Sequence, residues 1–409
     1  MSFIGFFSVR RDLRPTFWRD TQLATSRSAA NALATAVGFQ LLLNLGGDSK
    51  LLAMVQLGVF AGLLLSLGYV QLGTKIAPFK LLRLSEFGLA LCMFAVSGYA
   101  FGVFEGPIPL AIILGLGPAI GALGIPIITS SYASLYPADV RGGVVSTVRM
   151  LHGMTGLIVM TSVGWLMVRY PSSQPWHFVA AGGFVIVGVL RFTQLLDGHG
   201  PKLKPVGFFG SIRVLKQDTM FRRFQIFQFI LGVANLAAIP LLAVYVKEEL
   251  GLPMYLAVLV VPSGAIENGM VMLSARPMGW LFDRIGVVKH RVVASVLLAI
   301  CFGIWSITDS FTLAVIAAVF GGLGRAGGGV VWQIGSLYFA RKGEEGLYSG
   351  IHTALTGIRG VVGPLVAILL FETVLGRDYV LYLTITAGLV VFSAVGHALT
   401  VRLPAKPLR

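Results

Sequence analysis

Five charged residues lie deep inside long apolar segments of this sequence. They are one carboxylate, Glu267, and four arginines, Arg27, Arg149, Arg325 and Arg359. At ~1.5 Å per residue, Arg359 lies about 20 Å from the start of its segment, and Arg325 is equally central in its own. A central arginine costs at least ~2.5–3.5 kcal/mol in lipid, so it is expected to face a partner or a cavity. Because one carboxylate cannot fully pair with four arginines, we expect a surplus of positive charge.

The surplus charge favours binding of an anionic or carboxylate-bearing solute. The candidate binding residues are Arg325, Arg359, Arg27, Arg149, Asn235 and Asn268. In the alternative reading, the arginines donate to main-chain carbonyls freed by glycine-rich helices such as Gly321–Gly329. The two asparagines, for their part, are equally suited to hold neighbouring helices together.

Glu267 and His352 are the candidates for proton coupling. As a proton carrier, Glu267 would cycle between its charged and neutral forms; as a structural partner of an arginine, it would stay ionised throughout. His352 and His152 are lone imidazoles on apolar segments. Each fits either a satisfied core histidine or a proton relay, so both roles stay open.

Other chemistries have no pattern to support them. No cluster of His, Cys, Asp and Glu has the spacing of a metal site, and no Ser-His-Asp set stands out, so we expect neither an enzyme nor a cofactor. Gly324 to Gly329 follows a helical pattern rather than a strand, which excludes a dinucleotide site. Cys92 and Cys301 lie far apart in apolar segments and are expected to be buried free thiols.

The composition is that of a membrane protein. Hydrophobic residues make up 56% of the 409 residues, charged residues only 12%, and the mean hydropathy is +0.83. Soluble domains carry roughly 25% charged residues. The apolar runs are continuous and lack the two-residue alternation of a barrel, so we expect an all-α polytopic bundle. The net charge of +15 lies mainly in short loops, which argues against nucleic acid as a partner.

We expect twelve membrane spans. Their approximate bounds are 17–45, 50–73, 82–104, 107–134, 142–168, 176–196, 222–247, 253–282, 288–308, 311–339, 346–374 and 378–401. Twelve spans put both termini on one side, and the Lys and Arg count identifies that side as cytoplasmic. Residues on that side include Arg10, Arg11, Arg14, Arg19, Lys75, Lys80, Arg141, Arg284, Lys289, Arg291, Arg341 and Lys342, against Lys50, Arg169, Lys247 and Arg377 opposite.

The two halves of the chain repeat each other. The longest polar break predicts an N-terminal six-helix half at 1–196, a cytoplasmic linker at 197–220 and a C-terminal half at 221–409. Ser134-Leu135-Tyr136 recurs as Ser336-Leu337-Tyr338. Three glycines recur beside it: Gly142, Gly153 and Gly156 match Gly346, Gly357 and Gly360, at a shift of 204. A duplicated six-helix unit explains this register, as in several transporter folds.

A charged hairpin separates the eighth and ninth spans. It contains Gly279, Leu281, Asp283, Arg284 and Gly286, a G-x-L-x-D-R-x-G pattern. With twelve spans in two halves, this hairpin resembles the signature loop of the major facilitator superfamily. The equivalent first-half loop, Gly68 to Arg83, lacks the Asp-Arg pair, and the fifth span lacks the proline of the antiporter signature.

The resemblance implies a gating role for this hairpin. Asp283 would contact the partner half when the cytoplasmic side is closed, and pseudo-symmetry places its target at the start of the fifth span, near Arg141. Gly279, Asp283, Arg284, Gly286 and Arg141 are therefore the candidate gating residues.

The sequence thus predicts a secondary active transporter that moves a small organic, anionic solute by alternating access, coupled to protons. Two alternatives stay open: an exporter of amphipathic or cationic drug-like compounds, and a non-transporting assembly factor or receptor with the same fold. The expected partners are a small solute, protons and the lipid bilayer, for a monomer in the inner membrane if the source is bacterial.

Overall fold

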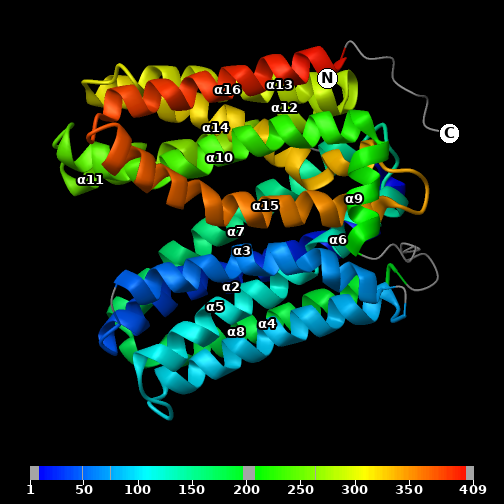
Figure 1. The fold of residues 1–409 in the computed structure, drawn as a ribbon. Coiled ribbons are helices and arrows are strands. Elements are labelled where there is room, and N and C mark those ends of the chain that lie inside the picture. Colours follow the sequence, from blue (N-terminus) through cyan, green and yellow to red (C-terminus); the bar gives the residue numbers. More distant parts are fainter. Residues whose placement is uncertain (1–8, 48, 74, 197–207, 263, 402–409) are drawn as a thin grey trace. The chain divides into compact units, whose positions relative to one another are not determined.

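The computed structural model describes residues 9–47, 49–73, 75–196, 208–262 and 264–401, and every regular element in these ranges is helical (Figure 1). The chain forms two compact units. Unit 1 contains Met1–Pro137, Val148–Phe208 and Lys342–Gly357; unit 2 contains Ala138–Thr147, Phe209–Arg341 and Ile358–Arg409. The beginning of helix α7 thus groups with unit 2, and the beginning of helix α15 groups with unit 1.

Unit 1 is built mainly from the first half of the chain. Its elements are η1 (Arg11–Leu13), α2 (Arg14–Asn44), α3 (Ser49–Leu72), α4 (Pro78–Ala100), α5 (Pro107–Leu123), α6 (Ile125–Leu135), most of α7 (Arg141–Arg169), η2 (Pro171–Ser173) and α8 (Gln174–Thr193). Prolines stand in the first turns of α4 and α5, where a missing N–H costs nothing. Helix α3 packs on α5, and α4 packs on α8.

The contact between α3 and α5 depends on small residues. A Cβ on Gly58 or Gly62 of α3 would collide with the carbonyl oxygens of Gly115 and Ala119 of α5. Glycine at these positions therefore lets the two backbones touch, which is how helices pack closely where lipid provides no hydrophobic drive.

Unit 2 is built mainly from the second half of the chain. Its elements are α9 (Phe208–Gln217), α10 (Thr219–Glu248), α11 (Met254–Val260), α12 (Ala265–Ile285), α13 (Val287–Trp305), α14 (Phe311–Ile334), η3 (Gly335–Tyr338), the second half of α15 (Glu345–Leu369), the π-helical η4 (Leu370–Val374) and α16 (Tyr379–Val401). Helix α13 packs on α14 and α16, α12 packs on α14, and α10 packs on α16. The core includes Leu242, Phe302, Trp305 and Val390.

One expectation needs correction. The predicted eighth span, 253–282, is two helices, because α11 ends at Val260 and α12 starts at Ala265. Pro262 lacks an N–H and favours an extended residue before it, and Val261 has φ −54° and ψ 155°. The predicted fourth span, 107–134, agrees with the apolar helical segment Pro107–Leu135, in which α5 and α6 meet at Gly124. The predicted linker, 197–220, contains helix α9; residues 197–207 lie outside the described residues.

The remaining helices lie close to the expected spans. Within the described residues, eight helices have the length and apolarity to cross a membrane: Pro107–Leu135, Arg141–Val163, Gln174–Thr193, Thr219–Val246, Val287–Trp305, Phe311–Tyr338, Glu345–Val374 and Tyr379–Thr400. The total of twelve stays a prediction. The repeat spacing recurs in the helix bounds, since α5 and α14 begin at 107 and 311, and α7 and α15 begin at 141 and 345.

Candidate solute and coupling sites

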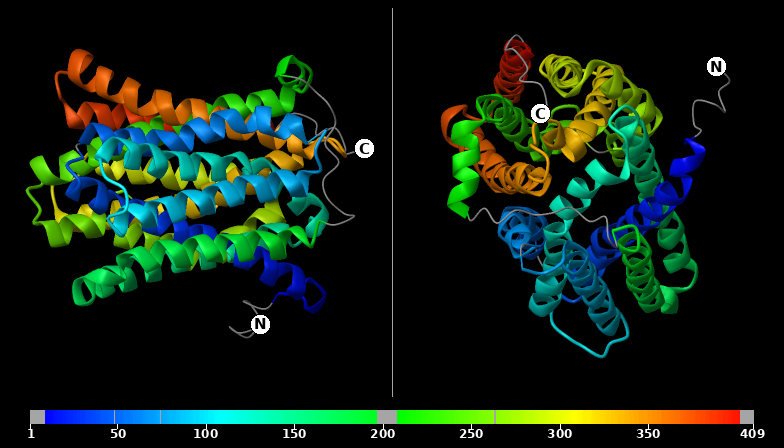
Figure 2. Two further views of the ribbon diagram at one scale, coloured as in Figure 1. Left: turned by 90° about the horizontal axis from the view of Figure 1, so that it is seen from below. Right: turned by 90° about the vertical axis from the view of Figure 1, so that its right-hand side faces the viewer.

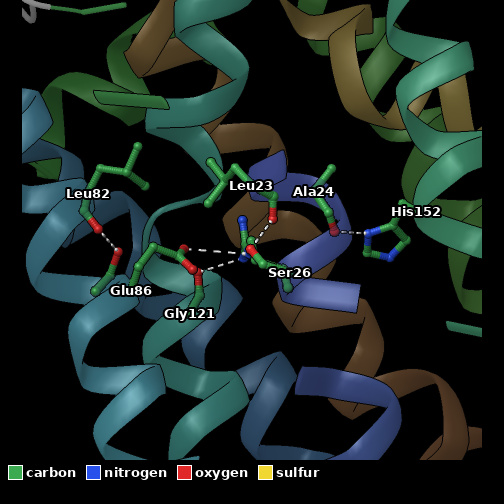
Figure 3. A network of polar contacts seen from close by, with 9 residues as sticks. Leu23, Ala24, Ser26, Leu82, Glu86, Gly121 and His152 are labelled. Carbon is green, nitrogen blue, oxygen red and sulfur yellow. Dashed lines mark hydrogen bonds and ion pairs between the residues drawn. The ribbon is translucent and has the colours of Figure 1, made fainter. Parts of the chain in front are cut away.

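Arg27 and Glu86 form a buried ion pair in unit 1. The Arg27 Nε lies 3.6 Å from Glu86 Oε1, and the two side chains are 15% and 0% exposed. A second guanidinium nitrogen, Nη2, donates to the main-chain oxygen of Gly121 at 2.9 Å. Figure 3 shows Glu86 and Gly121 on neighbouring helices around this centre. Arg27 from α2 thus connects α4 and α5, and it is the more accessible member of the pair.

A second buried carboxylate in the same unit is bonded to two tyrosines. The hydroxyls of Tyr132 and Tyr136 donate to Asp20 at 3.1 and 2.9 Å, and Asp20 is 1% exposed. The guanidinium groups of Arg149 and Arg27 both lie within electrostatic range of Tyr132. Unit 1 therefore gathers two arginines and two carboxylates around α2, α4, α6 and α7.

Sequence reasoning missed Asp20 and Glu86 as buried acids. The expectation of a single deep carboxylate, Glu267, is therefore wrong, because Asp20 and Glu86 are 1% and 0% exposed. The spacing of Tyr132 and Tyr136 was an available signal, since residues four apart share one helix face and can hold a common acceptor. Glu86 carried no such signal, because its partner Arg27 is far away in sequence.

His152 is a satisfied core histidine. Its Nδ1 lies 2.8 Å from the Ala24 oxygen, so this nitrogen carries the proton and donates (Figure 3). In return, Ser28 Oγ donates to the His152 oxygen at 2.6 Å. The two bonds join α2 to α7, and they support the structural reading of His152.

Glu267 and Arg325 form the corresponding pair in unit 2. Arg325 Nη1 lies 2.9 Å from Glu267 Oε1, and the side chains are 20% and 5% exposed. Glu267 stands in the first turn of α12, directly after the break at Val261–Gly264. Gly322 of α14 allows this approach, because a Cβ there would lie 2.6 Å from the Glu267 main-chain oxygen. The expected pairing of Glu267 with one deep arginine is therefore present.

Arg359 has a different partner. It is 6% exposed, and its Nη1 donates to the Gln228 main-chain oxygen at 2.8 Å. Gly232 of α10 lies against its side chain where a Cβ would collide. This contact is the carbonyl-bonded alternative considered from the sequence, although Arg359 also makes an interaction beyond this bond.

Arg291 was counted among the loop cations, and that assignment is wrong. It lies in α13, is 3% exposed and is within electrostatic range of Arg359. Three arginines of unit 2, namely Arg291, Arg325 and Arg359, therefore lie in or near its interior.

The other predicted residues occupy varied positions. Asn235 on α10 is half-buried, and its Oδ1 has no hydrogen-bond partner among the described residues. Asn268 is exposed. His352 is 2% exposed and groups with unit 1, whereas Glu267 groups with unit 2.

Asp283 contacts the start of α7, as expected from the resemblance. Its two carboxylate oxygens accept hydrogen bonds from the main-chain N–H groups of Gly142 and Gly143 at 2.7 and 2.8 Å. These N–H groups belong to the first helical turn, which has no internal acceptor for them and favours negative charge. Both sides of the contact belong to unit 2.

Glycines make room for this contact. A Cβ on Gly142 would lie 2.7 Å from the Gly279 oxygen, and a Cβ on Gly279 would collide with Ser146. Gly286 has φ +78°, a left-handed conformation that ends α12 and starts α13. Burial raises the pKa of Asp283, which follows the predicted span, to about 6, while the Gly143 and Gly142 N–H groups lower it.

The two candidate gating arginines, Arg284 and Arg141, lie against aromatic rings. Arg284 lies 4.2 Å from the centre of the Trp280 ring, and Arg141 lies 5.6 Å from that of Tyr338. Arg276 donates to Thr147 Oγ1 at 2.9 Å and so ties α12 to the beginning of α7. Arg276 and Asp283 of α12 therefore both contact residues near the start of α7.

Eight helices within the described residues are long and apolar enough to cross a membrane, which indicates an integral membrane protein. Comparison with known proteins gives similar sequences and similar folds. The chain is 25% identical over 320 residues to the multidrug resistance protein MdtG of Salmonella heidelberg (strain SL476), covering 76% of this chain and 75% of that protein. A search of family profiles finds no match.

Solved transporters share the fold. The E. coli fucose:proton symporter FucP matches with a TM-score of 0.72 and 13% identity, over 94% of this chain and 98% of that one. The human organic anion transporter MFSD10 matches with a TM-score of 0.68 and 14% identity, over 95% and 100%. The chain therefore shares the fold of these transporters, of which FucP belongs to the major facilitator superfamily.

Proposed function

We propose that the protein is a secondary active transporter that moves a small organic anion by alternating access. The supporting observation is the Arg325–Glu267 pair at the break between α11 and α12. Interrupted helices are where transporters of this kind place their substrate and ion sites, because the free main-chain groups and helix ends can bind charge. Arg325 keeps 20% of its side chain exposed and is the candidate ligand for a carboxylate.

The distribution of charge supports an anionic solute. In unit 1, Arg27 and Arg149 are matched by Asp20 and Glu86. In unit 2, three arginines lie in or near the interior: Arg291, Arg325 and Arg359. The acid that lies with them among the described spanning helices is Glu267. The surplus of positive charge therefore belongs to unit 2, where an anion would offset it. We keep Arg359, Arg27, Arg149, Asn235 and Asn268 as further candidate ligands.

We propose proton coupling through Glu267, with His352 as a second candidate. A solute carboxylate that binds Arg325 competes with Glu267 for the same guanidinium. Once Glu267 loses its counter-charge, protonation removes the cost of leaving it ionised among apolar helices. Solute binding and proton binding would then favour each other. FucP, one of the proteins that share this fold, is itself a proton symporter.

We propose that Asp283, Gly279, Arg284, Gly286 and Arg141 form a gate. The hydrogen bonds from Asp283 to the first turn of α7 would break when the solute path opens. We further propose two six-helix halves at 1–196 and 221–409, both termini in the cytoplasm, and a monomeric protein in the inner membrane.

Counterflow in proteoliposomes tests the transport proposal. Vesicles preloaded with a small carboxylate are diluted into trace radiolabelled carboxylate, for a panel of such compounds. Arg325→Gln should abolish counterflow. Arg169→Gln, which removes an exposed guanidinium outside the proposed solute site and gate, is the control for charge loss. Unchanged anion counterflow in Arg325→Gln would refute the role of Arg325.

Similarity to a multidrug resistance protein over 76% of the chain supports a second candidate, an exporter of drug-like compounds. Dye efflux from cells that express the protein discriminates between the two. Export of lipophilic cations with no carboxylate counterflow would favour the exporter. A protein that transports neither class of compound would favour the assembly-factor alternative.

A further inference from the structure

Helix α9 exposes cationic side chains on one face, and residues on its other face are buried or half-buried. Arg213, Lys216 and Gln217 are exposed, whereas Ser211 is buried and Val214 is half-buried. Positions separated by three or four residues share a helix face, so the exposed residues form one stripe. Arg223, near the start of α10, is exposed as well. We call Arg213, Lys216 and Arg223 the basic strip.

The orientation of α9 differs from that of the long helices of unit 2. In Figure 1 it stands upright beside the horizontal α10, and in the right view of Figure 2, where the long helices are seen nearly end-on, it is seen from the side. Because spanning helices run across the bilayer, a helix lying crosswise at their end runs along its surface. Amphipathic helices with basic polar faces bind in this position.

The turn between α9 and α10 is held by hydrogen bonds. Arg222 Nη1 donates to the main-chain oxygens of Leu215 and Lys216 at 3.2 and 3.0 Å, which satisfies carbonyls at the end of α9. Asp218, the acid beside the basic strip, accepts from the Phe221 N–H at 2.9 Å and caps α10. The crosswise orientation of α9 is therefore fixed by specific contacts, and the nearby carboxylate is already engaged.

We propose that the basic strip binds the headgroups of anionic phospholipids at the membrane surface. A rigid crosswise helix brings its cations to the level of the headgroups, and their phosphates provide the complementary charge. Each Lys or Arg close to an anionic surface strengthens binding about fivefold. Loss of Arg213 and Lys216 together should therefore weaken the contact about 25-fold. This inference does not depend on the transported solute.

A fluorescent label on α9 tests the proposal. Gln217→Cys places a thiol on the exposed face, and Cys92 and Cys301 are buried, so an environment-sensitive maleimide dye labels the introduced site. The full-length protein is reconstituted into phosphatidylcholine vesicles with and without phosphatidylglycerol. We expect a blue shift with phosphatidylglycerol that about 1 M salt reverses, since salt screens exposed charges.

The controls separate this site from general charge effects. Arg213→Gln with Lys216→Gln should abolish the blue shift, and Lys289→Gln, which removes an exposed cation on α13, should preserve it. Equal spectra in both vesicles would overturn the proposal, as would equal losses in Lys289→Gln and the double variant. A blue shift caused by inorganic phosphate in phosphatidylcholine vesicles would also overturn it, because the ligand would then be a free anion.

Discussion

Replacing Asp283 with alanine should loosen the contact between the end of α12 and the start of α7. Asp283→Ala removes the acceptor of two hydrogen bonds, at 2.7 and 2.8 Å from the Gly142 and Gly143 nitrogens. A hydrogen bond to a charged group contributes roughly 1.5–3 kcal/mol. Favourable charge at a helix start contributes about 0.3–1 kcal/mol, up to ~2 when partly buried. Since Asp283 is only partly buried and water can replace it, we expect a net loss of about 2 kcal/mol.

A loss of about 2 kcal/mol shifts an equilibrium between closed and open contacts roughly 30-fold towards open. Ser146, which lies against Gly279, reports this opening because it is fully buried. In a Ser146→Cys background without the native cysteines, a membrane-impermeant maleimide should react about 10- to 30-fold faster after Asp283→Ala, since labelling follows the open fraction.

Asp309→Ala is the matched control, because it also removes a carboxylate but lies exposed between α13 and α14, outside this contact. Its labelling rate should stay close to that of the parent. Equal rates in Asp283→Ala and the parent would refute the reasoning that the two hydrogen bonds hold this contact closed.

Three further predictions concern the same packing and charges. Gly322→Ala should lower the melting temperature by several degrees, because the new Cβ would lie 2.5 Å from Met270 Cβ and overpacking costs about 1–3 kcal/mol. Gly303→Ala is the control: nothing lies within 4 Å of its new Cβ, so the melting temperature should stay unchanged or rise. Tyr136→Phe should destabilise the protein by about 1–3 kcal/mol in chemical unfolding, since buried Asp20 loses a donor, whereas the exposed Tyr170→Phe should have little effect. Burial in the closed state raises the pKa of Asp283 from 3.8 to about 6, and this outweighs the lowering by the Gly143 and Gly142 N–H groups, so the closed state binds a proton more tightly than the open one. This contribution is complete below 3.8 and is lost as the pH rises through 6. Labelling at Ser146→Cys, corrected by the exposed Gln217→Cys, should therefore be slower at about pH 5 than at about pH 8, and Asp283→Asn should remove the difference; faster labelling in acid would contradict it.

Much of the helical architecture could be predicted, because long apolar runs dictate helices wherever lipid is the solvent. The family resemblance, together with the pseudo-symmetry of the two halves, also predicted the contact of Asp283 with the start of α7. The break at Pro262 was missed because apolar residues continue on both sides of it. A hydropathy pattern registers lipid affinity and does not register where the backbone changes direction.

The buried charges were harder to predict. Arg291 follows Lys289 in a basic group that looks like a loop, yet α13 begins at Val287 and turns Arg291 inwards. The acid Glu86 was discounted for its place near a helix end, and its partner Arg27 comes from another helix, α2. Both errors have one cause. Whether a charged side chain near a helix end faces water or protein depends on neighbours that only the tertiary structure supplies.

The most direct test of the account is proton-linked transport of an organic anion by the purified protein. In proteoliposomes that contain a trapped pH indicator, an inward gradient of a transported carboxylate should change the internal pH. Glu267→Gln should abolish this proton movement while counterflow of the same anion continues, because exchange needs Arg325 and not a titrating partner. Anion-driven proton movement that persists in Glu267→Gln, with folded protein and normal counterflow, would contradict the account.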